Sequence, residues 1–309
     1  MSWRARRLAD NPQPPWNIPE PISVHEIEMA DRTRIFLRRH GNPDGPRLVL
    51  SHGNSLAIDL YYPFWSLLTG DFDVVVYDLR NHGWTAVTDL KEHTIPTLID
   101  DHDIIIDAID RHLGEKPKIG VFHSFSSLAP LLSPTEGSRF SARVLFDPPL
   151  CKPGESYEAF DAAVKRASAS ARRRSRRFRN RGDFAELLQM SPVFRSVVPG
   201  THDLMERTTL REETDGDGYV LRCPPEYEAQ IMDYARLFAV SVDLGSLQCP
   251  TKVIGADPTL PFSYLPTMDL SDMLSVDYDF LPDATHLLQL ENPDECVAKM
   301  REFIELVSG

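Results

Sequence analysis

Residues 120–127 read Gly-Val-Phe-His-Ser-Phe-Ser-Ser, and this short stretch decides the expected fold. The apolar run Ile119–Phe122 is typical of a strand buried on both faces, and helical spacing follows it at 126–132. Ser124 therefore lies on a sharp turn between a strand and a helix. At such a turn a serine hydroxyl projects from the sheet, and the helix N-terminus offers backbone N–H donors to a developing oxyanion. Ser124 is the candidate nucleophile.

A histidine near the end of the sequence favours this role for Ser124 over that of an ordinary helix cap. His286 follows the last predicted strand, Val276–Phe280, and precedes the last predicted helix, at 294–307. A general base must reach the serine hydroxyl from the carboxyl edge of the sheet, and a loop at this point lies on that edge. We therefore predict that His286 is the base.

A turn directly after the predicted strand Leu48–Ser51 is the candidate oxyanion hole, and it reads His-Gly-Asn at 52–54. We expect the backbone N–H groups of Asn54 and Phe125 to bind the oxyanion of the substrate. Each such donor typically contributes about 3 kcal/mol to transition-state stabilisation. A glycine here also suits a tight turn. The two interpretations are compatible, because the turn itself forms the hole.

The remaining chain alternates short apolar runs with helical segments. Strands are expected at 24–29, 34–39, 48–51, 74–77, 119–122, 142–146, 252–254 and 276–280, and helices at 61–68, 94–113, 126–132 and 294–307. This alternation predicts an α/β fold, with a mostly parallel twisted sheet of about eight strands and helices on both faces.

The alternation of strands and helices stops after residue 149, where the sequence becomes strongly charged and helical in character and lacks short apolar strands. An insertion at this point is typical of a cap over the site. We divide the chain into an extended arm at 1–22, a first part of the core at 23–149, a helical cap at 150–245 and a second part of the core at 246–309.

Four segments, in this order along the chain, resemble the α/β-hydrolase superfamily. They are Ser51–Asn54, Tyr77–Gly83, the His-Ser turn at 123–124 and His286–Leu288. The resemblance covers residues 23–148 and 246–307 and implies a serine hydrolase with a catalytic triad and no cofactor.

A narrower resemblance rests on residues 52–54 together with 60–65, and on residues 219–229. These segments are similar to a branch that contains fungal acyl-CoA hydrolases of toxin and polyketide biosynthesis and a yeast peroxisomal lipase.

The third member of the triad is a carboxylate that orients His286 and stabilises its charged form. Asp147 ends the predicted sixth strand, and Asp257 follows the predicted seventh strand. Most of the superfamily has its acid after the seventh strand, whereas the narrower branch resembles hydrolases whose acid follows the sixth. We favour Asp147 and keep Asp257 as the alternative. The other carboxylate is then a turn residue ahead of a proline.

One departure from the superfamily pattern concerns the turn itself. The pattern is G-x-S-x-G, because the strand and the helix approach closely. Here Phe122 and Ser126 occupy the two glycine positions. Serine is small enough for the second position, but phenylalanine at the first needs space made by smaller neighbours. The departure favours one alternative, a catalytically silent protein that binds a small molecule or a partner in the same pocket.

The formal net charge is −13, from 33 basic and 46 acidic residues, which argues against nucleic acid as a partner. The sequence has no run of about 18 apolar residues, so we expect no membrane span. Residues 1–10 are not followed by an apolar stretch, which argues against a secretory signal. We expect a cytoplasmic protein that acts on a small acyl substrate, and we leave a homodimer open.

The cysteines and histidines show no spacing typical of a metal site or of a disulfide framework, so we predict no metal and no cofactor. His102 lies between Asp101 and Asp103, a set that could suggest metal ligands. The acidic helical context favours a solvated helix face.

The expected reaction is hydrolysis of an ester or thioester of a small hydrophobic acyl substrate through an acyl-enzyme. Carbon–carbon bond hydrolysis and lyase activity use similar triads and remain alternatives. An arginine-rich segment at 165–181 stands out in so acidic a chain. It could form a landing surface for the phosphates of an acyl-CoA, but we favour a solvated helix paired with carboxylates.

Overall fold

The computed structural model describes residues 16–308, apart from 152–154, 215 and 261–275. Its main sheet has eight strands in the order β1-β2-β4-β3-β5-β6-β10-β11. Their bounds are β1 Ser23–Glu28, β2 Arg34–Gly41, β3 Arg47–Ser51, β4 Asp73–Val76, β5 Lys118–His123, β6 Ala142–Phe146, β10 Thr251–Gly255 and β11 Asp277–Phe280. The β1–β2 and β2–β4 pairs are antiparallel and the others are parallel, which confirms the predicted sheet.

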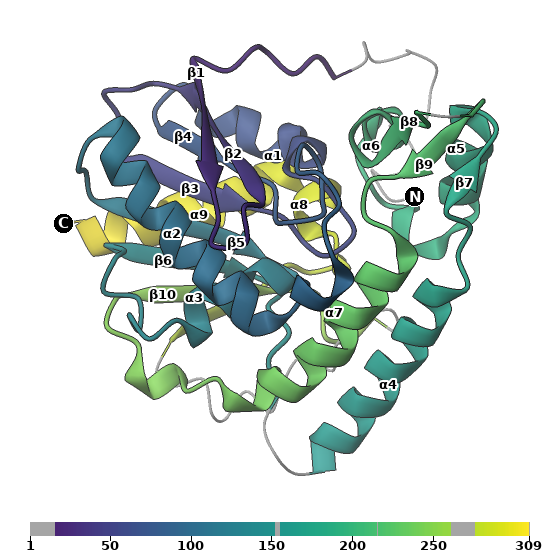
Figure 1. Ribbon diagram of the computed structural model, residues 1–309. Helices are drawn as coiled ribbons and strands as arrows, with labels where there is room; N and C mark the ends of the chain where they lie inside the picture. The colour runs from purple at the N-terminus through teal and green to yellow at the C-terminus, as the bar shows by residue number, and fades with distance from the viewer. Residues whose placement is uncertain (1–15, 152–154, 215, 261–275, 309) are drawn as a thin grey trace, which may run out of the picture.

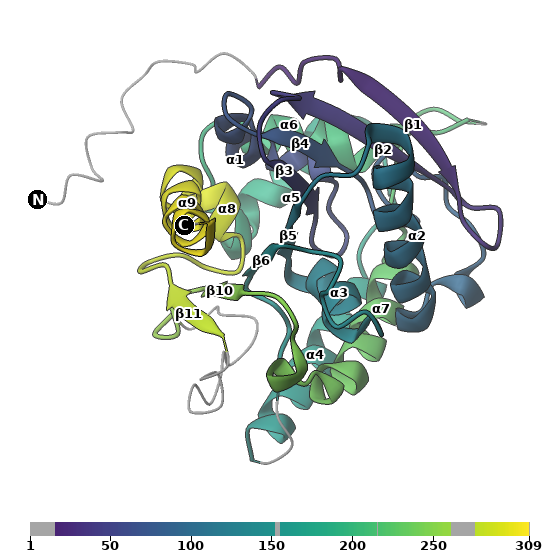
Figure 2. The ribbon, with the colours of Figure 1, turned by 90° about the vertical axis from the view of Figure 1, so that its left-hand side faces the viewer.

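Helices cover both faces of this sheet (Figures 1 and 2). The helices are α1 Tyr62–Trp65, α8 Leu288–Glu291 and α9 Pro293–Ser308 on one face, and α2 Ile95–Leu113 and α3 Leu128–Leu132 on the other. Successive side chains of a strand point to opposite faces. Leu48 and Leu50 accordingly belong to the core beneath α1 and α9, and Val49 belongs to the core beneath α2.

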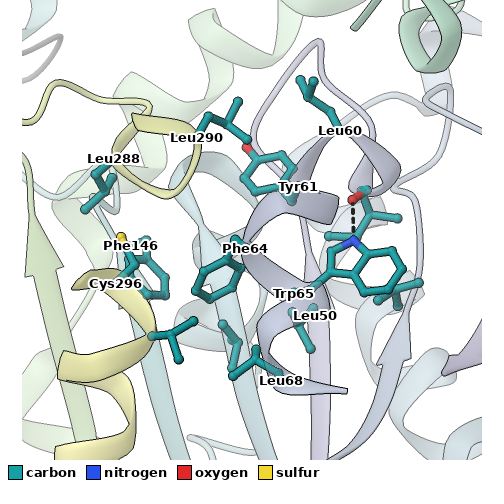
Figure 3. Close-up of a cluster of buried hydrophobic side chains, with 14 of the residues drawn as sticks. Leu50, Leu60, Tyr61, Phe64, Trp65, Leu68, Phe146, Leu288, Leu290 and Cys296 are labelled. Carbon is teal, nitrogen blue, oxygen red and sulfur yellow. Dashed lines mark hydrogen bonds between the residues drawn. The ribbon is translucent and has the colours of Figure 1, made fainter. Parts of the chain in front are cut away.

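The core on the α1 and α9 side joins segments that are far apart in the sequence. Leu50 of β3 and Phe146 of β6 pack there with Phe64 of α1 and with Leu288 of α8 (Figure 3). The indole N–H of Trp65 donates to the backbone oxygen at residue 58 over 3.1 Å. Burying each large apolar side chain contributes about 1.5–3 kcal/mol, so this core holds the C-terminal helices against the sheet.

An insertion, here defined as residues 155–246, lies between β6 and β10. It contains α4 Glu155–Arg172, α5 Arg181–Met190, α6 Thr201–Thr209 and α7 Pro225–Phe238. In the described part of the chain, each helix lacks either the length or the apolarity that crossing a bilayer requires.

The expectation that this region lacks short apolar strands was wrong. It also holds a small antiparallel sheet in the order β7-β9-β8, formed by Arg177–Phe178, Tyr219–Leu221 and Leu210–Glu212. Strands of two or three residues are too short for an alternating pattern to reveal.

His102 is not on a solvated face, contrary to expectation. Its side chain lies inside the core, with the residue 3% exposed, and its ring lies 5.6 Å from that of Phe122 and 5.8 Å from that of Phe140. Burial lowers the pKa of His102 to about 3, so the ring is neutral at physiological pH. The acidic neighbours in the sequence suggested that His102 is exposed to solvent, but tertiary packing buries this side of α2.

The ring of Phe122 has room because a residue without a side chain lies two positions earlier on the same strand. The ring is fully buried and meets Phe140 edge-on, at a centroid distance of 5.9 Å. Residues i and i+2 of a strand share a face, and Gly120 has no side chain to compete with the ring. A Cβ atom placed at Gly120 would lie 2.6 Å from Phe122 Cε2. The smaller neighbour that the sequence required is therefore Gly120.

This packing predicts that Gly120→Ala destabilises the fold by about 1–3 kcal/mol, as overpacking of a rigid core does. Gly70→Ala is the matched control, because nothing lies within 4 Å of the Cβ position there. Denaturant unfolding of the two variants measures the difference. Equal stabilities of the two variants would contradict this account of Phe122.

Candidate active site

Ser124 follows the last residue of β5, in a tight turn that precedes α3. Its φ is 51°, a left-handed conformation that costs a residue other than glycine roughly 1–3 kcal/mol. Ser126 closes the turn: its hydroxyl accepts from His123 N at 3.1 Å and donates to His123 O at 2.9 Å. The serine in the second glycine position thus adds two hydrogen bonds to the turn.

The structure brings together three of the predicted residues. The Nε2 atom of His286 lies 2.9 Å from Ser124 Oγ, and its Nδ1 atom lies 2.5 Å from Asp147 Oδ2. Ionised Asp147 can only accept, so Nδ1 carries the proton in a neutral ring and Nε2 accepts from the serine hydroxyl. This tautomer is the one that a general base requires.

Asp147 is held from two sides. Its other oxygen, Oδ1, accepts from the backbone N–H of Ala256 over 3.2 Å, and the residue is 1% exposed. The φ of Asp147 is 40°, so it too has a left-handed conformation. The backbone of the turn after β6 is thereby bent toward the loop that carries His286.

Asp257, the alternative acid, uses its carboxylate within its own loop. Its Oδ1 accepts from Thr259 N at 2.8 Å and from Thr259 Oγ1 at 2.6 Å, and its Oδ2 accepts from Asp283 N at 2.8 Å. These hydrogen bonds lower the pKa of Asp257. The geometry is that of a turn carboxylate, and it is Asp147 that contacts His286.

A pocket of about 320 Å³ opens onto Ser124 and His286, and Asn54 and Phe125 also line it. The insertion supplies most of its apolar wall, through Phe160, Val164, Phe194, Ile231 and Met232. Among the residues that the structure describes, no group of three or more His, Cys, Asp or Glu side chains is arranged to hold a metal ion.

Asn54 also ties the turn after β3 to the insertion. Its side-chain amide, Nδ2, donates to the backbone oxygen of Glu228 in α7 over 2.9 Å. The predicted oxyanion donor therefore has its side chain anchored on the helix that forms one wall of the pocket.

Two residues beside the site were missed from the sequence. The hydroxyl of Tyr61 lies 2.6 Å from His123 Nδ1, and His123 Nε2 lies 2.8 Å from the backbone oxygen of His286. In the sequence His123 belongs to the turn at 123–124, and Tyr61 belongs to the segment 60–65 and to the predicted helix at 61–68. They are 62 positions apart, so no local pattern links them.

Four of the eight arginines in the arginine-rich segment form ion pairs with carboxylates of the insertion itself, and one of the four, Arg174, also lines the pocket. The arginine pairs are Arg172–Asp233, Arg174–Glu228, Arg176–Glu226 and Arg177–Glu213. Three of these four pairs join the end of α4 and the residues after it to α7. The arrangement fits the interpretation of a charged helix paired with carboxylates.

Several solved structures resemble this one over nearly their whole length. An E-2-(acetamidomethylene)succinate hydrolase matches with a TM-score of 0.70 and 17% identity, covering 92% of this chain and 99% of that one. The thioesterase domain from the curacin biosynthetic pathway matches with a TM-score of 0.69 and 17% identity, covering 91% and 99%. An esterase from Thermogutta terrifontis matches with a TM-score of 0.63 and 20% identity, covering 92% and 99%. Identities this low show a shared fold.

Among curated proteins, the probable oxidoreductase EphD of Mycobacterium tuberculosis (strain ATCC 25618 / H37Rv) is 35% identical over 81 residues. That match covers 26% of this chain and spans only 14% of the curated relative. The model of the alpha/beta hydrolase family, in contrast, matches residues 48–299. Because that match includes most of the chain, the protein belongs to the alpha/beta hydrolase family.

Proposed function

We propose that this protein is a serine hydrolase that cleaves an ester or thioester of a small hydrophobic acyl substrate through an acyl-enzyme. One observation carries the proposal: a hydrogen-bonded chain runs from Ser124 through His286 to Asp147, and Ser124 and His286 line a mostly apolar pocket. Membership of the family supports hydrolase chemistry in general. The proposed assignment of bond and substrate rests on the site.

In the proposed first half-reaction, Ser124 Oγ attacks the substrate carbonyl carbon while His286 Nε2 takes the hydroxyl proton. Asp147 stabilises the imidazolium that forms. The backbone N–H groups of Asn54 and Phe125 donate to the oxyanion of the tetrahedral intermediate. Collapse of this intermediate breaks the bond to the leaving group, which receives the proton from His286.

The second half-reaction hydrolyses the acyl-enzyme. His286 takes a proton from water, the resulting hydroxide equivalent attacks the acyl carbon, and the proton returns to Ser124 Oγ as the acid leaves. This half-reaction needs two proton transfers at one nitrogen, Nε2 of His286. The tautomer that Asp147 imposes on His286 provides for both of them.

The pocket supports the choice of a small hydrophobic acyl group. A volume of about 320 Å³ lies at the lower end of the range of roughly 300–1,000 Å³ for small-molecule sites. The insertion supplies most of the apolar side chains of its wall, which supports a cap role for the insertion. The packing of Phe122 against Gly120 removes the main argument for a silent binding protein.

The first prediction concerns the nucleophile. Ser124→Ala should lower kcat for a p-nitrophenyl ester by a factor on the order of 10⁶ and abolish labelling by a fluorophosphonate probe. The variant should fold, because alanine needs no partner in the turn. Persistent labelling of the folded alanine variant would refute the assignment. A panel of p-nitrophenyl esters and acyl-CoAs of different chain lengths then distinguishes ester from thioester preference.

The second prediction concerns the acid. Asp147→Asn should lower kcat by a factor on the order of 10⁴, because an amide at this position no longer holds His286 in the required tautomer. Asp257→Asn is the matched control, since it removes a carboxylate from the neighbouring turn, and it should cost far less activity. Steady-state kinetics of both variants with one ester decide the matter. A larger loss of kcat for Asp257→Asn would indicate that Asp257, in the turn after β10, is the triad acid.

The third prediction concerns the arginine-rich segment. Because four of its eight arginines pair with carboxylates, we expect kcat/KM for an acyl-CoA and for a neutral ester of the same acyl chain to respond alike to salt. If the segment bound the phosphates of an acyl-CoA, kcat/KM for the acyl-CoA would instead fall steeply with added salt, because the Debye length shortens to about 8 Å at physiological ionic strength. Arg172→Ala, which breaks the pair with Asp233, should leave both salt profiles unchanged. A steep profile confined to the acyl-CoA would contradict the pairing account.

A further inference from the structure

A second line of hydrogen bonds crosses the site behind the proposed triad. The backbone N–H of Gly53 donates to the hydroxyl oxygen of Tyr61 over 3.1 Å. The hydroxyl of Tyr61 in turn lies 2.6 Å from His123 Nδ1, and His123 Nε2 lies 2.8 Å from the backbone oxygen of His286. The line therefore begins in the proposed oxyanion turn and ends at the loop of the proposed base.

The direction of every bond in this line is determined by its ends. The backbone oxygen of His286 can only accept, so His123 Nε2 must carry a proton and donate it. In a neutral ring His123 Nδ1 is then an acceptor, and the Tyr61 hydroxyl donates to it. That leaves the hydroxyl oxygen to accept from Gly53 N, which is the geometry observed. One tautomer of His123 satisfies all three bonds.

Burial keeps both side chains in the protonation states that the line requires. Burial lowers the pKa of His123 well below its ordinary value, and the charge of the nearby His286 lowers it further. Burial raises the pKa of Tyr61 well above its ordinary value. His123 thus stays neutral beside His286, whose ring centroid lies 4.8 Å away, so the two rings do not repel when His286 takes a proton.

We propose that Tyr61 and His123 are positioning residues that fix the separation between the oxyanion turn and the loop of the catalytic histidine. The proposal rests on the proposed function, because it assigns these residues to the same reaction. Tyr61 suits this role because it is rigidly held: the residue is 1% exposed and belongs to the core beneath α1. Figure 3 shows its ring among the side chains of that core.

Two substitutions of His123 separate the two ends of the line. Glutamine places an amide N–H near the Nε2 position and retains a donor to His286 while giving up the acceptor for Tyr61. Asparagine places an oxygen near the Nδ1 position and retains the acceptor for Tyr61 while giving up the donor to His286. If the line positions His286, His123→Asn should lose about tenfold in kcat and His123→Gln less than about threefold.

Tyr61→Phe tests the other end of the line, and Tyr77→Phe is its matched control. Tyr77 is also a buried tyrosine whose hydroxyl faces a histidine, His102, at 3.5 Å, but His102, unlike His123, does not line the pocket. We expect Tyr61→Phe to lower kcat about tenfold with KM changed less than about twofold. Tyr77→Phe should leave both constants close to those of the unaltered protein.

A measurement without substrate separates this proposal from the proposed function. The proton between His286 Nδ1 and Asp147 should give a downfield ¹H NMR resonance in the unaltered protein. His123→Asn and Tyr61→Phe should shift or broaden it, whereas Tyr77→Phe should not. If the unaltered protein shows no Ser124-dependent turnover, the proposed function fails, yet this resonance still tests the positioning of His286.

Thermal unfolding shows which variants are folded, and if Tyr61→Phe is not, the two His123 variants carry the test. Two results would overturn the proposal. One is a kcat for His123→Asn that equals or exceeds that of His123→Gln. The other is a folded Tyr61→Phe variant that matches Tyr77→Phe in both kcat and the His286 resonance.

Discussion

The imidazole of His286 bonds through both ring nitrogens, and each nitrogen meets a residue that follows a different parallel strand. Ser124 follows β5 and Asp147 follows β6, two strands that are neighbours in the sheet. Parallel strands all end at one edge, so residues 162 and 139 positions from the histidine arrive beside it. The order of the strands, the bent turns and the anchored loops all serve this one arrangement.

Much of this arrangement could be predicted from local patterns. A serine between a buried strand and a helix has few structural contexts, and a histidine after the last strand must lie at the same sheet edge. The choice between Asp147 and Asp257 could not be made in this way. Both follow neighbouring parallel strands and both precede a proline. What separates them is the direction of each carboxylate, which depends on backbone angles and on contacts across the loops.

The features that the sequence did not predict share one physical cause. Each depends on contacts with other side chains that no local pattern records. The two acidic neighbours of His102 suggested solvent, but Phe122 and Phe140 from other elements bury it. Phe122 departs from the expected glycine, but Gly120, two residues earlier on the same face of the strand, leaves room for its ring. Tyr61 and His123 carry no shared sequence signal, because their contact arises only when the turn that precedes α1 packs on the sheet.

The left-handed backbone at Ser124 and Asp147 sets stability against the proposed function. Glycine adopts such angles without strain, so replacing either residue with glycine would relieve a cost of roughly 1–3 kcal/mol. The same change would delete the hydroxyl or the carboxylate from the site. Screening libraries of this protein for thermal tolerance alone would therefore tend to enrich chains that are robust and inert, and any such campaign needs a selection for turnover beside it.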